Sequence, residues 1–354
     1  FGIQYMLSLT FTHMSKAYGG VPALRDVSLS LMGGRVHALM GENGAGKSTL
    51  IKLIAGVVPA DSMTVEKDGK AISLANAQDA QAANFRFIHQ ELNIVPQISV
   101  AENILLGRRF PRRFGLAVDW PSVRERARAA LRFLGADHID VRQLAGDFTA
   151  GDQMLIKIAA ALVTDPDTDA RADLYVLDEP TAALTAQESE MLFDVIKRLT
   201  STGAAVLYIS HRMDEVLRIC DDITVLRDGK HVSSGPVSET TKDQIIRAMT
   251  GRDVKDAYPL RADHQRSDVI VNCRDVTTAH LSNLNFTLRA GEVLGVAGLA
   301  EAGQNEFLEL LMGLEKLQSG QAQFINGPLP TSPAQAWGRG VAYLPKERRT
   351  QGLM

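Results

Sequence analysis

The stretch Gly41-Glu-Asn-Gly-Ala-Gly-Lys-Ser48 decides the fold of this chain. It follows a continuous apolar run, Val36–Met40, and opens a segment whose apolar residues recur at helical spacing over 50–54. A glycine-rich turn that joins a strand to a helix and ends in Lys-Ser fits the phosphate-binding P-loop pattern in full. The sequence therefore predicts a site for a nucleoside triphosphate at residues 41–48.

The parts of this loop have distinct predicted roles. Glycines let backbone N–H groups turn toward phosphate oxygens, and the start of the following helix adds a field that favours anions. Lys47 is predicted to reach the β- and γ-phosphates of ATP, and Ser48 to ligate Mg²⁺. The residues expected to contact the nucleotide are Gly41, Asn43, Gly44, Ala45, Gly46, Lys47, Ser48 and Thr49. A glycine-rich turn without a ligand is disfavoured, because spacing and context agree.

A second predicted strand ends in two carboxylates. Leu174–Leu177 is a continuous apolar run followed directly by Asp178 and Glu179. Beside a P-loop, Asp178 can hold Mg²⁺ through water, and Glu179 can orient and deprotonate the water that attacks the γ-phosphate. Alone, a strand that ends in Asp-Glu is more often a solvated strand end, so this interpretation depends on the P-loop upstream.

Apolar runs alternate with helical patterns through the first 250 residues. Leu174–Leu177 and Ala204–Ile209 are continuous rather than alternating, which favours buried strands. Thr185 and Glu188 have the spacing of a capping box, and Gly203 ends the helical pattern that follows. Strands that alternate with helices predict an α/β fold with a largely parallel sheet.

With these motifs in this order, the chain resembles the ABC ATPase family. The resemblance implies an ABC-type nucleotide-binding domain with a helical subdomain, and it implies roles for further residues. Tyr18 matches the aromatic that stacks on adenine, and Gln90 matches the glutamine that senses the γ-phosphate and Mg²⁺ and adjoins the membrane subunit. Residues 182–185 match the loop that crosses to the partner domain, and His211 matches the switch histidine on the γ-phosphate. Taken singly, Tyr18 and His211 would more often be structural residues.

The signature motif departs from the common LSGGQ form of that family. Here it reads Phe-Thr-Ala-Gly-Asp at 148–152. Thr149 keeps a hydroxyl and Gly151 keeps close backbone approach, so both are expected to contact ATP held by a partner domain. The added charge of Asp152 is expected to be unfavourable near a γ-phosphate, which predicts a weak or non-hydrolytic signature.

The sequence also repeats itself. GRVHALMGENGAGKSTLIKLIAG begins at Gly34 and matches GEVLGVAGLAEAGQNEFLELLMG, which begins at Gly291, an offset of 291 − 34 = 257. We expect a first nucleotide-binding domain at 6–250, a charged linker at 251–267 and a partial, degenerate copy at 268–354. By this repeat logic the chain is expected to be a fragment that lacks roughly 150 residues of the second copy.

The second phosphate loop differs in its charges. Gln304 replaces the lysine, Asn305 replaces the Mg²⁺ hydroxyl, and Glu301 stands where the first loop has Gly44. The second unit is therefore predicted to bind ATP poorly and not to hydrolyse it. Together with the altered signature, this predicts an asymmetric motor with one competent site, completed by further sequence or by another subunit.

Composition narrows the class of protein. A formal net charge of −3 gives no broad electrostatic case for nucleic acid, and two cysteines form neither a disulfide framework nor a zinc pattern. No run of about 18 apolar residues occurs, so a membrane role must run through a partner. The basic segment 107–115 is interpreted as a solvated loop on the permease side, in preference to a contact with lipid headgroups or nucleic acid.

The tandem layout, HQELNIVPQISVAENILLG, DEPTAALT and the altered second loop resemble bacterial importers of monosaccharides such as ribose, galactose, xylose and autoinducer-2. This resemblance implies a peripheral ATPase on the cytoplasmic face of the inner membrane. Its implied partners are two transmembrane permease subunits, a second nucleotide-binding half or subunit and, indirectly, a periplasmic sugar-binding protein. The alternatives are a non-transport ABC ATPase, which the short linker and altered second loop disfavour, and a regulatory subunit with little turnover, which Glu179 and His211 disfavour.

Overall fold

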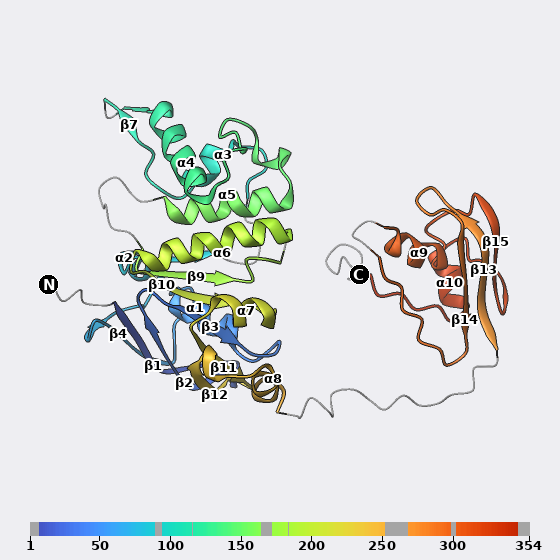
Figure 1. The fold of residues 1–354 in the computed structure, drawn as a ribbon, viewed down its shortest axis with the longest axis horizontal. Coiled ribbons are helices and arrows are strands. Elements are labelled where there is room, and N and C mark those ends of the chain that lie inside the picture. The colour runs from blue at the N-terminus through green and yellow to red at the C-terminus, as the bar shows by residue number, and fades with distance from the viewer. Residues whose placement is uncertain are drawn as a thin grey trace. The chain divides into compact units, whose positions relative to one another are not determined.

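The computed structural model describes residues 7–88, 94–114, 116–163, 172–182, 184–251, 268–298 and 302–345. The chain divides into two compact units, 1–258 and 259–354 (Figure 1). None of the described helices is both long and apolar enough to cross a bilayer.

The first unit contains twelve strands and eight helices among its described residues. The strands are β1 (Ser8–Tyr18), β2 (Val21–Met32), β3 (Val36–Met40), β4 (Ser62–Lys67), β5 (Lys70–Ile72), β6 (Phe85–Ile88), β7 (Arg112–Arg113), β8 (Ala117–Val118), β9 (Leu174–Asp178), β10 (Ala205–Ile209), β11 (Asp222–Arg227) and β12 (Lys230–Pro236). The helices are α1 (Lys47–Ile54), α2 (Ala77–Ala82), α3 (Val100–Leu105), α4 (Trp120–Leu134), α5 (Ala150–Leu162), α6 (Ala186–Ser201), α7 (Met213–Ile219) and α8 (Lys242–Thr250).

The central sheet has six strands in the order β12-β11-β3-β10-β9-β6. All neighbouring pairs are parallel except β11 with β12, which is antiparallel. The three predicted strands are observed as β3, β9 and β10, and their residues are buried almost throughout, as expected for strands covered on both faces. The predicted α/β fold is therefore confirmed.

Alternate residues of β10 point into two different cores. Ala205, Leu207 and Ile209 pack in a cluster with α1 and with the antiparallel sheet β2-β1-β4-β5. Val206 and Tyr208 pack in a second cluster that includes α3, α4, α5 and α6. The two-residue period of a strand thus lets one sheet support a nucleotide-loop layer on one face and a helical layer on the other.

The helical layer contains the predicted capping box and one feature that differs from the prediction. Thr185 and Glu188 form the capping box of α6, which ends at Ser201, two residues before Gly203. The basic segment interpreted as a loop is in part a short hairpin, in which β7 pairs with β8. Figure 1 shows α6 along the sheet, α3, α4 and α5 beyond it, and β7 at the outer end of this layer.

The second unit repeats the antiparallel sheet and the helix that follows it. Its sheet has the order β14-β13-β15-β16, built from β13 (Val269–Thr277), β14 (Leu284–Arg289), β15 (Ser319–Phe324) and β16 (Gly327–Pro328). Its helices are α9 (Gln304–Leu311) and α10 (Pro333–Gly338). The start of α9 lies 257 residues after the start of α1 (304 − 47), the same offset as in the sequence repeat.

One part of the repeat differs in structure. Residues 293–297, the counterparts of β3, form no strand, and Val293 is 95% exposed. In the first unit β3 is flanked by β10 and β11, whereas among the described residues of the second unit no strand pairs with 293–297. Because backbone pairing defines a strand, the same apolar pattern forms no strand here.

Candidate functional site

The loop between β3 and α1 has the backbone of a phosphate cradle. Gly44 and Gly46 have φ of +85° and +101°, which favours glycine. A Cβ atom on Gly46 would lie 2.8 Å from the carbonyl oxygen of Ala23, so the loop is packed against the start of β2. Gly46 caps α1 and offers no side-chain hydrogen bond, which leaves the start of this helix to an external anion.

Lys47 lies inside this loop. Its Nζ donates to the carbonyl oxygens of Gly41, at 2.7 Å, and Glu42, at 3.0 Å. Burial lowers the pKa of Lys47, while the charges of Glu179 and Asp178 act to raise it. The side chain is thus a half-buried cation within electrostatic range of both predicted carboxylates. Asn43 lies in the same loop and is exposed, and Ser48 is the second residue of α1.

The parallel sheet brings the predicted carboxylates to the same edge as this loop. Ile209 on β10 pairs with Leu39 on β3 and with Asp178 on β9, so the carboxyl ends of the three strands lie together. Burial raises the pKa of Asp178, and the neighbouring charge of Glu179 raises it further, while Lys47 lowers it. Asp178 is therefore a carboxylate that lacks full compensation from protein groups alone.

Glu179 and His211 contact each other at this edge. His211 Nδ1 lies 3.1 Å from Glu179 Oε1 and donates to it, since a carboxylate only accepts. The backbone of Glu179 has φ of +48°, and its N–H donates to the carbonyl oxygen of Ile209 at 2.9 Å. The left-handed backbone conformation is uncommon for glutamate, and such backbone strain occurs preferentially at functional sites.

The hairpin of β1 and β2 carries Tyr18 next to the phosphate loop. Tyr18 pairs with Val21, close to the residues of β2 that contact Gly46. Its side chain is 46% exposed, and the ammonium of Lys16 lies 5.8 Å from the ring centre. A half-exposed ring at this place is consistent with a stacking surface. Gln90, the other residue expected to face the γ-phosphate, lies outside the described residues.

The signature segment is engaged within the helical layer. Thr149 caps α5, and its hydroxyl donates to Asp152 Oδ2 at 2.9 Å. Asp152 Oδ1 lies 2.8 Å from Nε2 of His138. A Cβ atom on Gly151 would lie 2.3 Å from Oε1 of Glu188, so this glycine permits close packing against the start of α6. Asp152, whose charge is expected to be unfavourable near a γ-phosphate, thus has hydrogen-bond partners within its own unit.

The sequence prediction overlooked a buried carboxylate beside His211. Glu215 Oε2 accepts from Tyr208 at 2.7 Å, Thr181 at 2.9 Å and Ser210 at 3.2 Å, and Oε1 accepts from Arg212 at 2.7 Å. Burial and Glu215 together raise the pKa of the Tyr208 phenol. Glu215 therefore ties the segment after Glu179 to both flanks of His211. Its position four residues after His211 was the only sequence signal, and it reads equally well as a surface helix charge.

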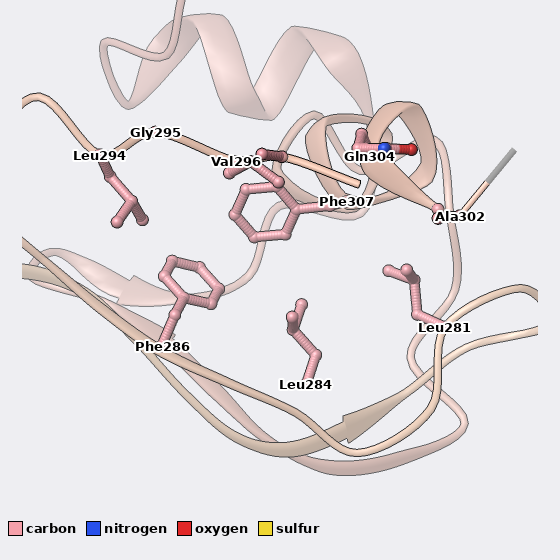
Figure 2. A pocket seen from close by; sticks show the side chains of 11 residues that line it. Leu281, Leu284, Phe286, Leu294, Gly295, Val296, Ala302, Gln304 and Phe307 are labelled. Atoms are coloured by element: carbon pink, nitrogen blue, oxygen red, sulfur yellow. The ribbon is translucent and has the colours of Figure 1, made fainter. Parts of the chain in front are cut away.

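The corresponding loop of the second unit borders an apolar cavity of about 350 Å³. Figure 2 shows Phe286 and Phe307 side by side in its lining, where their rings pack edge to face with their centres 4.7 Å apart. Gly303 keeps a φ of +100°, but the residue after it is Gln304. The Gln304 amide nitrogen lies 2.6 Å from where a Cβ on Gly298 would stand. The left-handed conformation of the glycine before the helix is kept, whereas a neutral amide stands in place of the lysine.

Comparison with known proteins gives concordant matches. A family model described as ABC transporter matches residues 24–182. The ribose import ATP-binding protein of Chromobacterium violaceum is 40% identical over 350 residues, which cover 98% of this chain and 68% of that protein. The protein of the same name from a strain of Bacillus cereus is 41% identical over 351 residues, covering 98% and 69%. The chain thus spans about two thirds of the length of these relatives.

Solved structures of ATP-binding cassettes of ABC transporters have the same fold. One, in an ADP conformation, aligns with a TM-score of 0.59 at 26% identity and covers 70% of this chain and 99% of that one. A nucleotide-free cassette aligns with a TM-score of 0.57 at 27% identity and covers 70% of this chain and 96% of that one.

Substitution of Asp178 by asparagine is expected to stabilise the nucleotide-free protein. Since the folded-state pKa is raised above its ordinary value of 3.8, the folded protein binds this proton more tightly than the unfolded chain. The contribution of Asp178 to the stability of the wild type is therefore lost as pH rises from about 4 through the folded-state pKa. In chelator at pH 7 we expect Asp178→Asn to raise the apparent Tm by about 2–4 °C, and the gain to vanish below about pH 4.

Asp173→Asn is the matched control, because Asp173 precedes the same strand but pairs with Lys67 at 2.7 Å. That variant should not gain stability. A lower Tm for Asp178→Asn at pH 7 would contradict the proposed imbalance of charge.

Substitution of Glu215 by glutamine is expected to destabilise the first unit by about 2 kcal/mol, because charge-assisted hydrogen bonds to a buried carboxylate are lost. Urea denaturation measures this difference. Glu190→Gln is the control, since Glu190 forms a solvent-exposed ion pair with Arg218, and its effect should be far smaller. Equal effects of the two substitutions would show that the buried network contributes nothing specific.

Proposed function

Because this chain belongs to the ABC transporter family, among the ATP-binding proteins of sugar importers, we propose that its first unit hydrolyses ATP to drive uptake of ribose or a related monosaccharide. The family and sugar-import relatives confirm the resemblance drawn from the sequence. The observation that carries the site assignment is the meeting of Lys47, Asp178, Glu179 and His211 at one edge of the central sheet.

ATP is assigned to the β3–α1 loop. Glycine backbone at Gly44 and Gly46 lets N–H groups approach phosphate oxygens, and Lys47 can exchange its two carbonyl partners for phosphate oxygens of higher negative charge. Thr49 lies in the first turn of α1, where the helix favours an anion. Tyr18 offers its exposed face to the adenine ring.

The residues present also fit Mg²⁺. Ser48 and Asp178 supply the hydroxyl and carboxylate oxygens that this hard cation prefers. A bound cation would also stabilise the charged form of Asp178, whose pKa is raised without it. When bound, Mg²⁺ supplies neutralisation of charge on the β- and γ-phosphates. Ser48, Asp178 and Gln90 are therefore assigned as its protein-side partners.

Glu179 is assigned as the general base. Its carboxylate accepts the proton of the attacking water, and the water oxygen forms a bond to the γ-phosphorus as the bond to the ADP oxygen breaks. His211 donates to the same carboxylate at 3.1 Å, which orients Glu179. The imidazole of His211 is assigned to the γ-phosphate. Thr181 and Ser210, held by Glu215, fix the chain on both sides of this pair.

The wider assembly follows from this assignment. The protein is proposed to act on the cytoplasmic face of the inner membrane with two permease subunits, to which a periplasmic binding protein delivers sugar. The segment around Gln90 is assigned to the permease contact. Thr149 and Gly151 are assigned to a nucleotide held by a second half or subunit, so ATP binding would close the two halves and hydrolysis would reset them.

The second unit is proposed to be a degenerate copy of the first. Its antiparallel sheet has the same strand order as that of the first unit, and α9 starts at the offset of the sequence repeat. Both observations support domains at 6–250 and 268–354 joined by a linker at 251–267. Gln304 cannot supply the charge that Lys47 supplies. The copy is therefore assigned a structural part in an asymmetric motor.

Two substitutions test the proposed site. Lys47→Ala should lower the affinity of the chain for Mg·ATP by about 100-fold in calorimetry, because a charge-assisted phosphate contact is lost. Lys52→Ala, in the last turn of α1 and exposed, is its control and should bind normally. Glu179→Gln should retain binding but lower ATP turnover of the assembly with its permease subunits by about 10²–10⁴-fold.

The two outcomes are independent. Unchanged affinity of Lys47→Ala for Mg·ATP would show that the nucleotide does not bind at the β3–α1 loop. Unchanged ATP turnover in Glu179→Gln would show that Glu179 is not the general base, and it would favour the alternative of a regulatory subunit.

The asymmetry of the two units can be measured by photolabelling of the intact chain with 8-azido-ATP. Mass spectrometry of the labelled peptides should find at least about tenfold more label in residues 7–251 than in 268–345, because the second loop has an amide in place of the cation. Gln304→Lys with Asn305→Ser should increase labelling of the second unit. Equal labelling of both wild-type units would contradict a degenerate second site.

A further inference from the structure

The hairpin of β7 and β8 ends in two large apolar side chains that are almost wholly exposed. Phe114 is 88% exposed and Leu116 is 93% exposed. Figure 1 shows β7 at the outer end of the helical layer, away from the central sheet. We propose that this hairpin, here called the finger (described residues 108–114 and 116–118), inserts its tip into an anionic lipid surface.

The base of the finger is fixed to the helical layer. The rings of Phe110 and Trp120 pack edge to face with their centres 6.2 Å apart, and Phe110 contacts the core of that layer. Arg108 Nη2 donates to the carbonyl oxygen of Ala160 on α5 at 2.7 Å. The pairing of Arg112 with Val118 then extends the chain beyond this base. The tip is therefore held outward by anchored residues.

The finger carries a local excess of positive charge, which favours contact with anions. Between Glu102 and Asp119 the sequence contains four arginines and no acidic residue, although the whole chain has a net charge of −3. Arg112 and Arg113 are exposed on β7, and the Arg113 guanidinium lies 5.5 Å from the centre of the Phe114 ring. Basic side chains next to exposed aromatic and aliphatic ones are the composition that binds at a headgroup–acyl boundary.

A lipid surface fits this tip better than a folded protein does. Stable protein interfaces bury about 800 Å² on each partner, whereas the tip offers two apolar side chains. Lipid contact needs no complementary shape, and one weak anchor of this kind gives marginal, reversible binding. Such binding suits a protein whose main attachment is a permease. The proposal adds a contact to the proposed function and does not depend on nucleotide turnover.

Vesicle sedimentation tests the apolar part. The intact chain should bind vesicles of phosphatidylcholine with about 30% phosphatidylglycerol and bind pure phosphatidylcholine at least about tenfold more weakly. Phe114→Ser with Leu116→Ser should lower binding to the anionic vesicles by about tenfold. These exposed positions contribute little to the core, so the variant should fold. Val57→Ser with Ile325→Ser, two exposed apolar positions elsewhere, is the matched control and should bind like the wild type.

A second pair of measurements tests the charge and the location. Arg112→Gln with Arg113→Gln should lower anionic binding by about tenfold and reduce its dependence on salt. The chain has two tryptophans, so a Trp337→Phe background leaves Trp120 at the base of the finger as the reporter. Its emission should shift to the blue with anionic vesicles and should not shift in the Phe114/Leu116 variant.

The proposal would be overturned if the wild type did not bind anionic vesicles, or if the wild type and the finger variants bound them equally. It would also be overturned if the finger variants lost binding to the permease in detergent while their binding to vesicles stayed unchanged. The last would assign the finger to a protein partner. Because finger variants should keep wild-type affinity for Mg·ATP, failure of the finger and failure of the nucleotide site are distinguishable.

Discussion

The half-buried ammonium of Lys47 is the feature around which the first unit is arranged. Removing a cation from water is unfavourable unless other groups compensate it. Here the carbonyl oxygens of Gly41 and Glu42 provide hydrogen bonds, and Asp178 and Glu179 provide opposite charge. The compensation is incomplete on both sides, since the pKa of Lys47 is lowered and that of Asp178 is raised. A polyanion with its cation would satisfy both groups, which is the electrostatic reason to assign a Mg²⁺ nucleotide to this place.

The sheet makes this arrangement possible. β10 pairs in parallel with both β3 and β9, so residues far apart in sequence emerge at one edge. The position of β10 is fixed by packing on its two faces, with Leu207 in one core and Tyr208 in the other. A slip of one residue would exchange these faces, so the register that places His211 beside Glu179 is enforced by the whole hydrophobic core.

Local patterns in the sequence predicted the features that local physics determines. Continuous apolar runs predicted the strands β3, β9 and β10, and the spacing of Thr185 and Glu188 predicted a capping box that the structure confirms. The network of Glu215 could not be predicted in this way, because its donors Tyr208 and Thr181 come from different elements. The partner of Asp152 was overlooked for the same reason: His138 approaches it through tertiary packing of the helical layer.

The two phosphate loops separate backbone shape from binding chemistry. Gly46 and Gly303 have φ of +101° and +100°, and α1 and α9 begin directly after them, so the glycine that precedes the helix has the same conformation in both units. Charge is a separate property of the loop, and the residue at the start of the helix contributes to it. Where that side chain is Lys47, a cation is held by the loop carbonyls, and where it is Gln304, a neutral amide approaches the loop instead. Glycine conformation at the start of the helix and the charge of the residue that follows it are thus separate properties, and they can differ independently between the two units.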